Sequence, residues 1–200
     1  MTCLGDGLYD VPQGKVATVV THLEMLAPAP ARPAPDPQNA SFQAVPAPEA
    51  DWYRDLFTRV GGTDWLWFSR LELTDDALSA ILQDPDVEIY TLMVDGRAEA
   101  LLELDFREAG ACELAFFGLT PTLIGSGAGR YLMNRAIELA WTRPIARFHV
   151  HTCTLDHPAA LSFYRRSGFI PVRQQIEIAD DPRLTHDLPD TAGPHIPIFS

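Results

Sequence analysis

A glycine-rich turn between two regular elements carries the clearest chemistry in this chain. The segment Ile124–Gly129 reads IGSGAG and stands between an apolar, strand-like run (residues 113–119) and an amphipathic, helix-like pattern (residues 130–141). Glycines leave the backbone N–H groups of such a turn uncovered, and the N-terminus of the following helix is electropositive. The turn therefore indicates a site for the phosphate or pyrophosphate of a nucleotide or coenzyme.

Two familiar phosphate motifs do not fit this turn. A Walker loop ends in Gly-Lys-Ser/Thr, but the only lysine of the chain is Lys15. The dinucleotide fingerprint needs a further glycine in the first turn of the helix and an acidic residue about 20 positions later. Glu138 is too close and lies within the helix pattern, so a different kind of phosphate site is expected.

A second pattern follows at residues 156–169, which read DHPAALSFYRRSGF. Pro158 suits the first turn of a helix, and Gly168 suits the left-handed position that ends one. Strand-like alternation precedes the segment (residues 146–153) and follows it (residues 169–178). The turn and this segment thus belong to a strand–helix–strand–helix–strand series.

With both motifs in place, the chain resembles the GNAT superfamily of acyl-CoA-dependent N-acetyltransferases over residues 50–178. The family pattern Arg/Gln-x-x-Gly-x-Gly/Ala corresponds to residues 124–129, and the pattern Asn-x-x-Ala-x-x-x-Tyr-x-x-x-Gly-Phe corresponds to residues 157–169. The chain departs from these patterns at Ile124, where the family has Arg or Gln, and at His157, where it has Asn.

The resemblance implies an α/β fold with a central mixed, mostly antiparallel sheet and helices on both faces. It implies acetyl-CoA as co-substrate, with no metal, and a bulge at Gly118 that splays two strands apart. The positions that it assigns to the coenzyme are Phe117, Leu119, Ile124, Gly125, Ser126, Gly127, Ala128, Gly129, Arg130, His157 and Ala160.

The same resemblance implies that an amine attacks the thioester directly, because Tyr164 stands where the family has the acid for the departing thiolate. Glu113 stands at the spacing at which histone-type members carry their general base, and a water relay to a base is the other route. Tyrosine on an amphipathic helix is ordinarily a core residue, and Glu113 also fits a solvated strand position.

Other residues and other functions stay open on the sequence. Glu103, Asp105 and His151 are rival bases, and Cys153 is a nucleophile for a covalent route that we consider weaker. Trp65, Trp67 and Phe68 fit either the core or an acceptor pocket. A non-catalytic acyl-CoA-binding regulatory module is the alternative function, and a partner-binding role for the proline-rich segment is a third.

Composition bounds the partners. The formal net charge of −12 makes nucleic acid and anionic membranes poor partners and favours a cationic acceptor, namely a small-molecule or peptide amine. No run approaches the roughly 18 apolar residues of a membrane span, and no signal-peptide pattern opens the chain. The three cysteines are widely spaced, so a reducing cytoplasm is the simplest expectation and a zinc site is not expected.

The sequence divides into an N-terminal strand with a proline-rich extension (residues 1–49), an acetyltransferase domain (residues 50–178) and a tail (residues 179–200). Residues 15–25 alternate like a strand, which we expect at a sheet edge and which offers a route to a homodimer. Residues 27–48 hold seven of the 17 prolines and are expected to run as a semi-rigid connector without ladder pairing.

Further elements precede the glycine turn. Helices are expected at residues 51–60, ended by Gly61 and Gly62, and at 74–82, capped by Thr74. A hairpin is expected from strands 87–94 and 98–107 around Asp95 and Gly96, with a further strand at 112–119. The tail shows no clear last strand, although the family usually has one.

Overall fold

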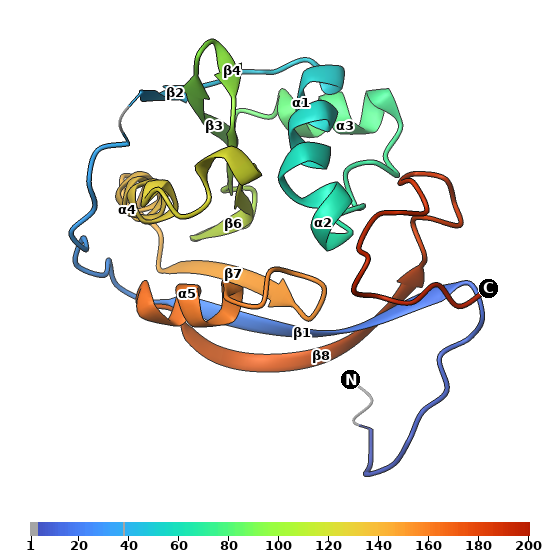
Figure 1. Cartoon of the computed structure of the whole chain (residues 1–200). Coiled ribbons are helices and arrows are strands. Elements are labelled where there is room, and N and C mark those ends of the chain that lie inside the picture. The colour runs from blue at the N-terminus through green and yellow to red at the C-terminus, as the bar shows by residue number, and fades with distance from the viewer. Residues whose placement is uncertain (1–3, 38) are drawn as a thin grey trace.

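The computed structural model describes residues 4–37 and 39–200 as helices packed on both faces of one eight-stranded mixed sheet (Figure 1). The strand order is β2-β3-β5-β6-β7-β1-β8, and β4 pairs with β3. The strands are β1 (Lys15–Met25), β2 (Ala40–Ala44), β3 (Val87–Val94), β4 (Arg97–Ala98), β5 (Ala100–Asp105), β6 (Ala111–Leu119), β7 (Arg147–Cys153) and β8 (Ile170–Asp180). The helices are α1 (Ala50–Phe57), η1 (Thr58–Gly62), α2 (Thr63–Trp65), α3 (Asp75–Leu82), η2 (Pro121–Leu123), α4 (Ala128–Ala140) and α5 (Ala160–Arg166).

The N-terminal strand β1 is not at an edge of the sheet. It lies between β7 and β8 and runs antiparallel to both, with His22 opposite His151 on one side and Arg173 on the other. Val20, Leu23 and Met25 are buried there. The expected edge position was wrong because two long partners cover β1, and the outer edge is β8 instead. The tail after β8 forms no strand, and the strand beside β7 is β1.

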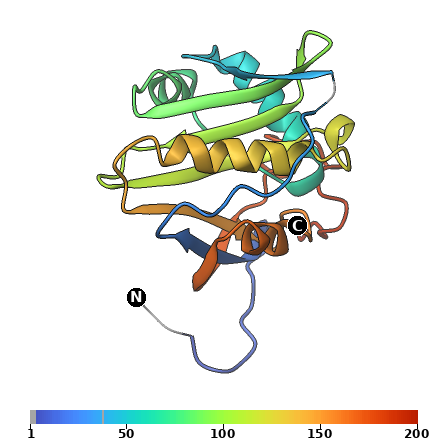
Figure 2. The same cartoon turned by 90° about the vertical axis from the view of Figure 1, so that its left-hand side faces the viewer.

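The proline-rich extension contains one regular strand that the sequence interpretation missed. Residues 40–44 form β2 and pair antiparallel with β3, with Phe42 opposite Leu92. The expectation of no ladder pairing was wrong here because Pro37 and Pro46 flank the strand, so that no N–H within it is lost. Residues 27–37 do run extended, on the side of the sheet that carries α4 and α5 (Figure 2).

The first helical segment continues through the two glycines that were expected to end it. A π-helical turn, η1, follows α1 and leads into α2, and the chain leaves the helix at Leu66 with a φ of 54°. A Cβ added to Gly61 would collide with the ring of Trp67, so this glycine permits close packing rather than a stop. The helix α3 has its expected cap, because the Thr74 hydroxyl accepts from the N–H of Ala77 (3.3 Å).

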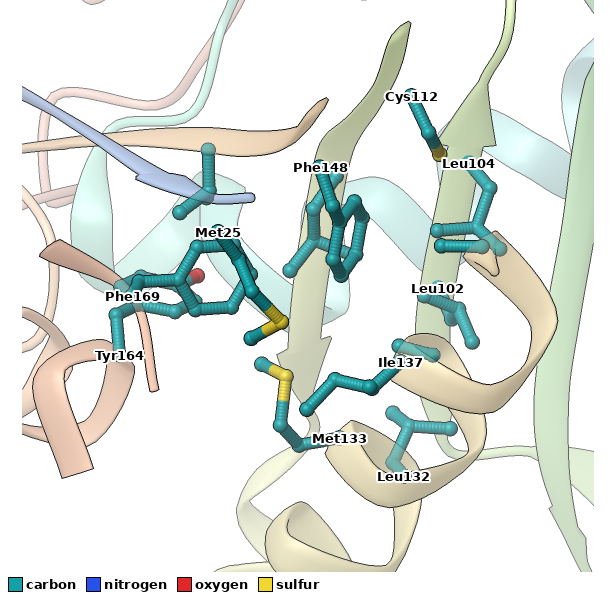
Figure 3. Close-up of a cluster of buried hydrophobic side chains, with 14 of the residues drawn as sticks. Met25, Leu102, Leu104, Cys112, Leu132, Met133, Ile137, Phe148, Tyr164 and Phe169 are labelled. Atoms are coloured by element: carbon teal, nitrogen blue, oxygen red, sulfur yellow. The ribbon is translucent and has the colours of Figure 1, made fainter. Parts of the chain in front are cut away.

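The main core lies between the sheet and the helices α4 and α5. Leu132, Met133 and Ile137 of α4 pack on strand residues such as Leu102 and Phe148 (Figure 3). A second cluster packs α1 and α3 against the opposite face of β3 and β5. Every residue of β5 is buried because helices cover both faces of this strand. The two layers hold the strands β6 and β7 in place, and these two strands carry the site.

Candidate active site

The strands β6 and β7 separate, and a cavity opens between them. Their parallel pairing covers only Ala111–Glu113 of β6, opposite Arg147–His149 of β7. Beyond these residues a cavity of about 760 Å³ is lined by residues 114–119 of β6 and by Val150, His151 and Cys153 of β7. The expected splay between two central strands is therefore present.

The bulge in β6 lies at Ala115, not at Gly118. The β5–β6 register pairs Leu104 with Leu114 and Glu103 with Phe116, so one residue of β6 is extra. Gly118 has another reason to be glycine: a Cβ there would collide with Val60 of η1 and approach Trp67. The prediction of a bulge at Gly118 was wrong, since a packing glycine and a bulge glycine look alike in sequence.

Backbone groups of Phe117 and Leu119 face the opening. The N–H of Thr120 donates to the carbonyl of Glu99 (3.0 Å), whereas the carbonyl of Ala100, which lies opposite Leu119, accepts from the hydroxyl of Thr91 on β3 (2.6 Å). Ala100 and Leu119 therefore form a pair that does not exchange hydrogen bonds. Exchanging and non-exchanging pairs alternate along such a ladder. Phe117 and Leu119 therefore turn their N–H and C=O groups away from β5, toward the side where β7 has separated.

The glycine turn lines the same cavity. Gly125 and Gly127 adopt φ values of 83° and 90°, which L side chains rarely take. Ile124, Gly125, Gly127, Gly129 and Arg130 all border the cavity. The helix α4 begins at Ala128, two residues earlier than expected, so its electropositive N-terminus lies at the turn itself.

Two residues of the turn, Ser126 and Ala128, do not border the cavity; they stabilise the turn itself. The Ser126 hydroxyl donates to the carbonyl of Leu123 (2.7 Å) and accepts from the N–H of Ala128 (3.2 Å). Ala128 is fully buried in the main core. The turn thus has bare backbone, room for a ligand and an electropositive helix end, which fits the diphosphate of a coenzyme.

Tyr164 lies where α5 meets the cavity. Its ring packs edge-on against Phe163 and Phe169 (5.8 and 6.0 Å between centroids), and Figure 3 shows it beside Phe169. Its hydroxyl has no hydrogen-bond partner among the described side chains and backbone groups, and the residue borders the cavity. Burial, with the charge of Asp156 adding to it, raises the pKa of Tyr164 above its ordinary value, so the phenol stays protonated.

Glu113 contacts a histidine rather than the cavity. Nδ1 of His151 donates to Oε1 of Glu113 (3.1 Å), because an ionised carboxylate can only accept. His151 borders the cavity, whereas Glu113 does not. The hydrogen bond to Glu113 raises the pKa of His151, and the same bond lowers the pKa of Glu113. The structure therefore joins two of the candidate bases into one pair, with Nε2 of His151 left to accept a proton.

The other two candidate bases are occupied elsewhere. Glu103 is fully buried and accepts from Tyr53 and Arg70. Asp105 holds the guanidinium of Arg107, which lowers its pKa despite burial. Neither carboxylate borders the cavity.

The far half of the cavity has aromatic walls and one residue that the sequence interpretation did not single out. Trp65, Trp67 and Phe68 all border it. Asp156 accepts from Trp67 Nε1 (2.8 Å) and from Thr152 Oγ1 (2.6 Å), and thereby ties the end of β7 to the aromatic wall. The signal for Asp156 was its place in the turn between a strand and a helix, where side-chain oxygens commonly cap backbone groups. The helix α5 begins at Ala160, so the prediction of Pro158 in its first turn was wrong.

His157 and Ala160 complete the cavity side of α5. His157 is exposed, accepts through Nδ1 from the N–H of Ala159 (3.0 Å), and packs edge-on against Trp65 (5.0 Å between centroids). The imidazole of His157 therefore accepts a hydrogen bond from the backbone two residues later, as the side chain of an asparagine at this position can also do.

A split mixed sheet, a glycine turn at a helix N-terminus and a buried tyrosine on one cavity define an acyltransferase architecture of the coenzyme-A-dependent type. The family model described as Acetyltransferase (GNAT) family matches residues 50–169. The chain belongs to this family, whose members in general use acetyl-CoA as co-substrate.

Solved structures agree on the fold. A GCN5-related N-acetyltransferase from Sphaerobacter thermophilus superposes with a TM-score of 0.60 at 14% identity, over 85% of this chain and 53% of that one. A GCN5-related N-acetyltransferase from Kribbella flavida gives a TM-score of 0.53 at 17% identity, over 86% and 63% of the two chains. The chain thus spans about half to two thirds of the length of these relatives. No curated protein matches the sequence.

Two further observations concern the described residues only. No helix among them is both long and apolar enough to cross a membrane. Within residues 4–37 and 39–200, no three His, Cys, Asp or Glu side chains gather closely enough to hold a metal ion.

Proposed function

We propose that this enzyme transfers the acetyl group of acetyl-CoA to a primary amine by direct attack of the amine on the thioester. One observation carries the proposal: a single cavity is bordered at once by the glycine turn, by Tyr164 and by His151. A diphosphate at the turn and an amine near His151 would therefore share one space, with the open edge of β6 between them.

The backbone of β6 would hold the thioester. The N–H of Phe117 faces the opening and would stabilise the negative charge that develops on the thioester carbonyl oxygen. The polar groups of Leu119, two residues along the same edge, would hold the amide-containing arm of the coenzyme.

His151 would remove the proton of the attacking amine. An alkylammonium has a pKa near 10.4, so the amine must lose a proton before it attacks. His151 borders the cavity and has Nε2 free of the Glu113 hydrogen bond, and Glu113 both orients the ring and makes it a stronger base. Glu113 then acts through His151 or through water rather than as the group nearest the amine.

Tyr164 would protonate the departing thiolate. Its protonated, unpartnered hydroxyl is suited to an acid and not to a base. The covalent route through Cys153 is disfavoured, because burial raises the pKa of its thiol and keeps it protonated.

The acceptor side favours a cation. Asp156 and Glu177 are the carboxylates that border the cavity and His151 and His157 are its histidines, and no arginine or lysine contacts Trp65 or Trp67 in the contacts of the described residues. A positively charged amine is therefore preferred there over an acceptor that carries a carboxylate beside the amine.

The alternative, a non-catalytic acyl-CoA-binding module, shares the glycine turn but needs neither Tyr164 nor the Glu113–His151 pair. Titration calorimetry with acetyl-CoA tests the turn, and thiol release with a panel of amines tests the transfer. We expect binding and amine-dependent release of coenzyme A. Binding without thiol release for every amine class would favour the module instead, and absence of binding would refute both.

A further inference from the structure

The extended segment before β2 is clamped across the two helices that border the coenzyme half of the cavity. We call residues 27–37 the strap (Figure 2). The N–H of Arg32 donates to Oδ1 of Asn134 (3.2 Å), and Nδ2 of Asn134 donates to the carbonyl of Arg32 (2.7 Å). Nη1 of Arg32 donates to the carbonyl of Arg166 (3.1 Å) at the end of α5. The strap is therefore fixed to both α4 and α5.

Packing holds the strap on either side of this clamp. A Cβ added to Gly168 would lie 2.6 Å from Cβ of Ala29, so the chain passes Gly168 closely. A Cβ added to Gly127 of the glycine turn would lie 3.1 Å from Cγ of Pro35. Prolines restrict φ along the strap and reduce the entropy lost when it is held in place.

The strap forms part of the cavity wall. Pro33 and Pro35 border the cavity together with Gly125, Gly127 and Arg130. Any group bound at the glycine turn is therefore next to the strap, although the strap lies about 90 residues earlier in the sequence.

The arginines at this place lack carboxylate partners. In the part of the chain that the structure describes, five arginines form no ion pair with a carboxylate. They are Arg32, Arg130, Arg165, Arg166 and, on β8, Arg173. Arg32 and Arg166 are in contact, and Nη1 of Arg130 lies 3.5 Å from the carbonyl of Pro33. A protein with a formal net charge of −12 thus keeps an uncompensated positive cluster beside the cavity.

We propose that the strap is part of the coenzyme site, and that Arg32 with Arg130 and Arg166 binds the phosphomonoester on the ribose of coenzyme A. This inference rests on the proposed function. In this proposal the backbone N–H groups of the glycine turn bind the diphosphate, and the guanidinium groups of the arginines bind the separate phosphomonoester. A phosphomonoester carries a charge between −1 and −2 near neutral pH, and guanidinium groups match its geometry. Pro33 and Pro35 provide the apolar wall between the two phosphate sites.

The test compares acetyl-CoA with acetyl-3′-dephospho-CoA by titration calorimetry. We expect the wild-type protein to bind acetyl-CoA at least about 10-fold more tightly, as charge-assisted hydrogen bonds to one phosphate allow. Arg32→Gln is expected to remove most of this preference by weakening acetyl-CoA alone. Asn134→Ala keeps every arginine but releases the clamp, and it is expected to reduce the preference as well. Arg97→Gln, which removes the same charge at the β4 turn away from the cavity, is the control and is expected to keep the preference.

Each result decides the proposal. If Arg32→Gln weakens both coenzymes equally, Arg32 acts on the diphosphate and the phosphomonoester assignment is overturned. If Arg32→Gln and Asn134→Ala bind as well as the wild type or more tightly, the strap only covers the groove and the proposal fails. If the wild-type protein binds neither coenzyme, the proposed function fails first and the strap proposal falls with it.

Discussion

Replacing Tyr164 with phenylalanine separates its role as an acid from its role in the core. The variant loses a hydroxyl that bonds to no described protein group, while the ring keeps its contacts with Phe163 and Phe169. Since no protein hydrogen bond is lost, we expect the free energy of unfolding to change by less than about 1 kcal/mol.

Activity is expected to fall much more than stability. Removal of a general acid typically costs 10²–10⁴-fold in rate. A thiol has a pKa near 8.5, so its thiolate leaves fairly easily, and we expect the lower end of about 10²-fold in kcat. That loss corresponds to about 2.7 kcal/mol of transition-state stabilisation.

The assay is thiol release from acetyl-CoA with an accepted amine, run beside thermal unfolding and acetyl-CoA titration of the same samples. Tyr131→Phe is the matched control, because Tyr131 is a half-buried tyrosine of α4 that does not border the cavity. The reasoning is refuted if Tyr164→Phe retains the wild-type kcat, or if its rate loss is accompanied by an equal loss of stability.

Three further perturbations test other parts of the site. Glu113→Gln removes the carboxylate charge from the hydrogen bond that raises the pKa of His151. The acidic limb of the rate profile, where His151 becomes protonated, should therefore move to lower pH; a profile that keeps its wild-type midpoint would exclude His151 as the base. His22, Asp156 and Glu177 also face His151, and the substitution leaves all three in place. Gly127→Ala places a Cβ at a φ of 90° and 3.1 Å from Cγ of Pro35. The turn is expected to leave its binding geometry to relieve roughly 1–2 kcal/mol of left-handed strain, so that the acetyl-CoA Kd by calorimetry should rise by about 10-fold; unchanged affinity would mean that the turn does not touch the ligand. Gly61→Ala forces a methyl group into the Trp67 ring, and denaturant unfolding should show about 1–3 kcal/mol of destabilisation; a stable variant would contradict the close packing of η1 on the cavity wall.

Local signals predicted much of this fold because they depend on neighbouring residues. Thr74 caps α3 as expected, and Asp95 and Gly96 both take positive φ in the turn after β3. The glycine turn lies between β6 and α4, and Gly168 ends α5 with a φ of 105°. In each case the conformational freedom of one glycine, or one side-chain hydrogen bond within a few residues, decides the local structure.

Long-range placement was outside the reach of the sequence. The pattern of residues 15–25 predicts a strand, but it contains nothing that selects β7 and β8 as its partners. The family resemblance predicts Glu113 as a base, yet the neighbouring strand supplies His151, which contacts Glu113 and itself borders the cavity. The bulge at Ala115 leaves no mark in the sequence, since one extra residue in β6 becomes visible only opposite β5.

By itself, the sequence determined the motifs and the type of most elements, because backbone conformation and capping are short-range, and it predicted a phosphate ligand at the glycine turn. The tertiary structure alone decided that β1 lies inside the sheet, that His151 contacts Glu113, and that the strap borders the cavity. These outcomes follow from the packing of segments far apart in the chain, where each choice of partner depends on the surface that all the other elements leave exposed.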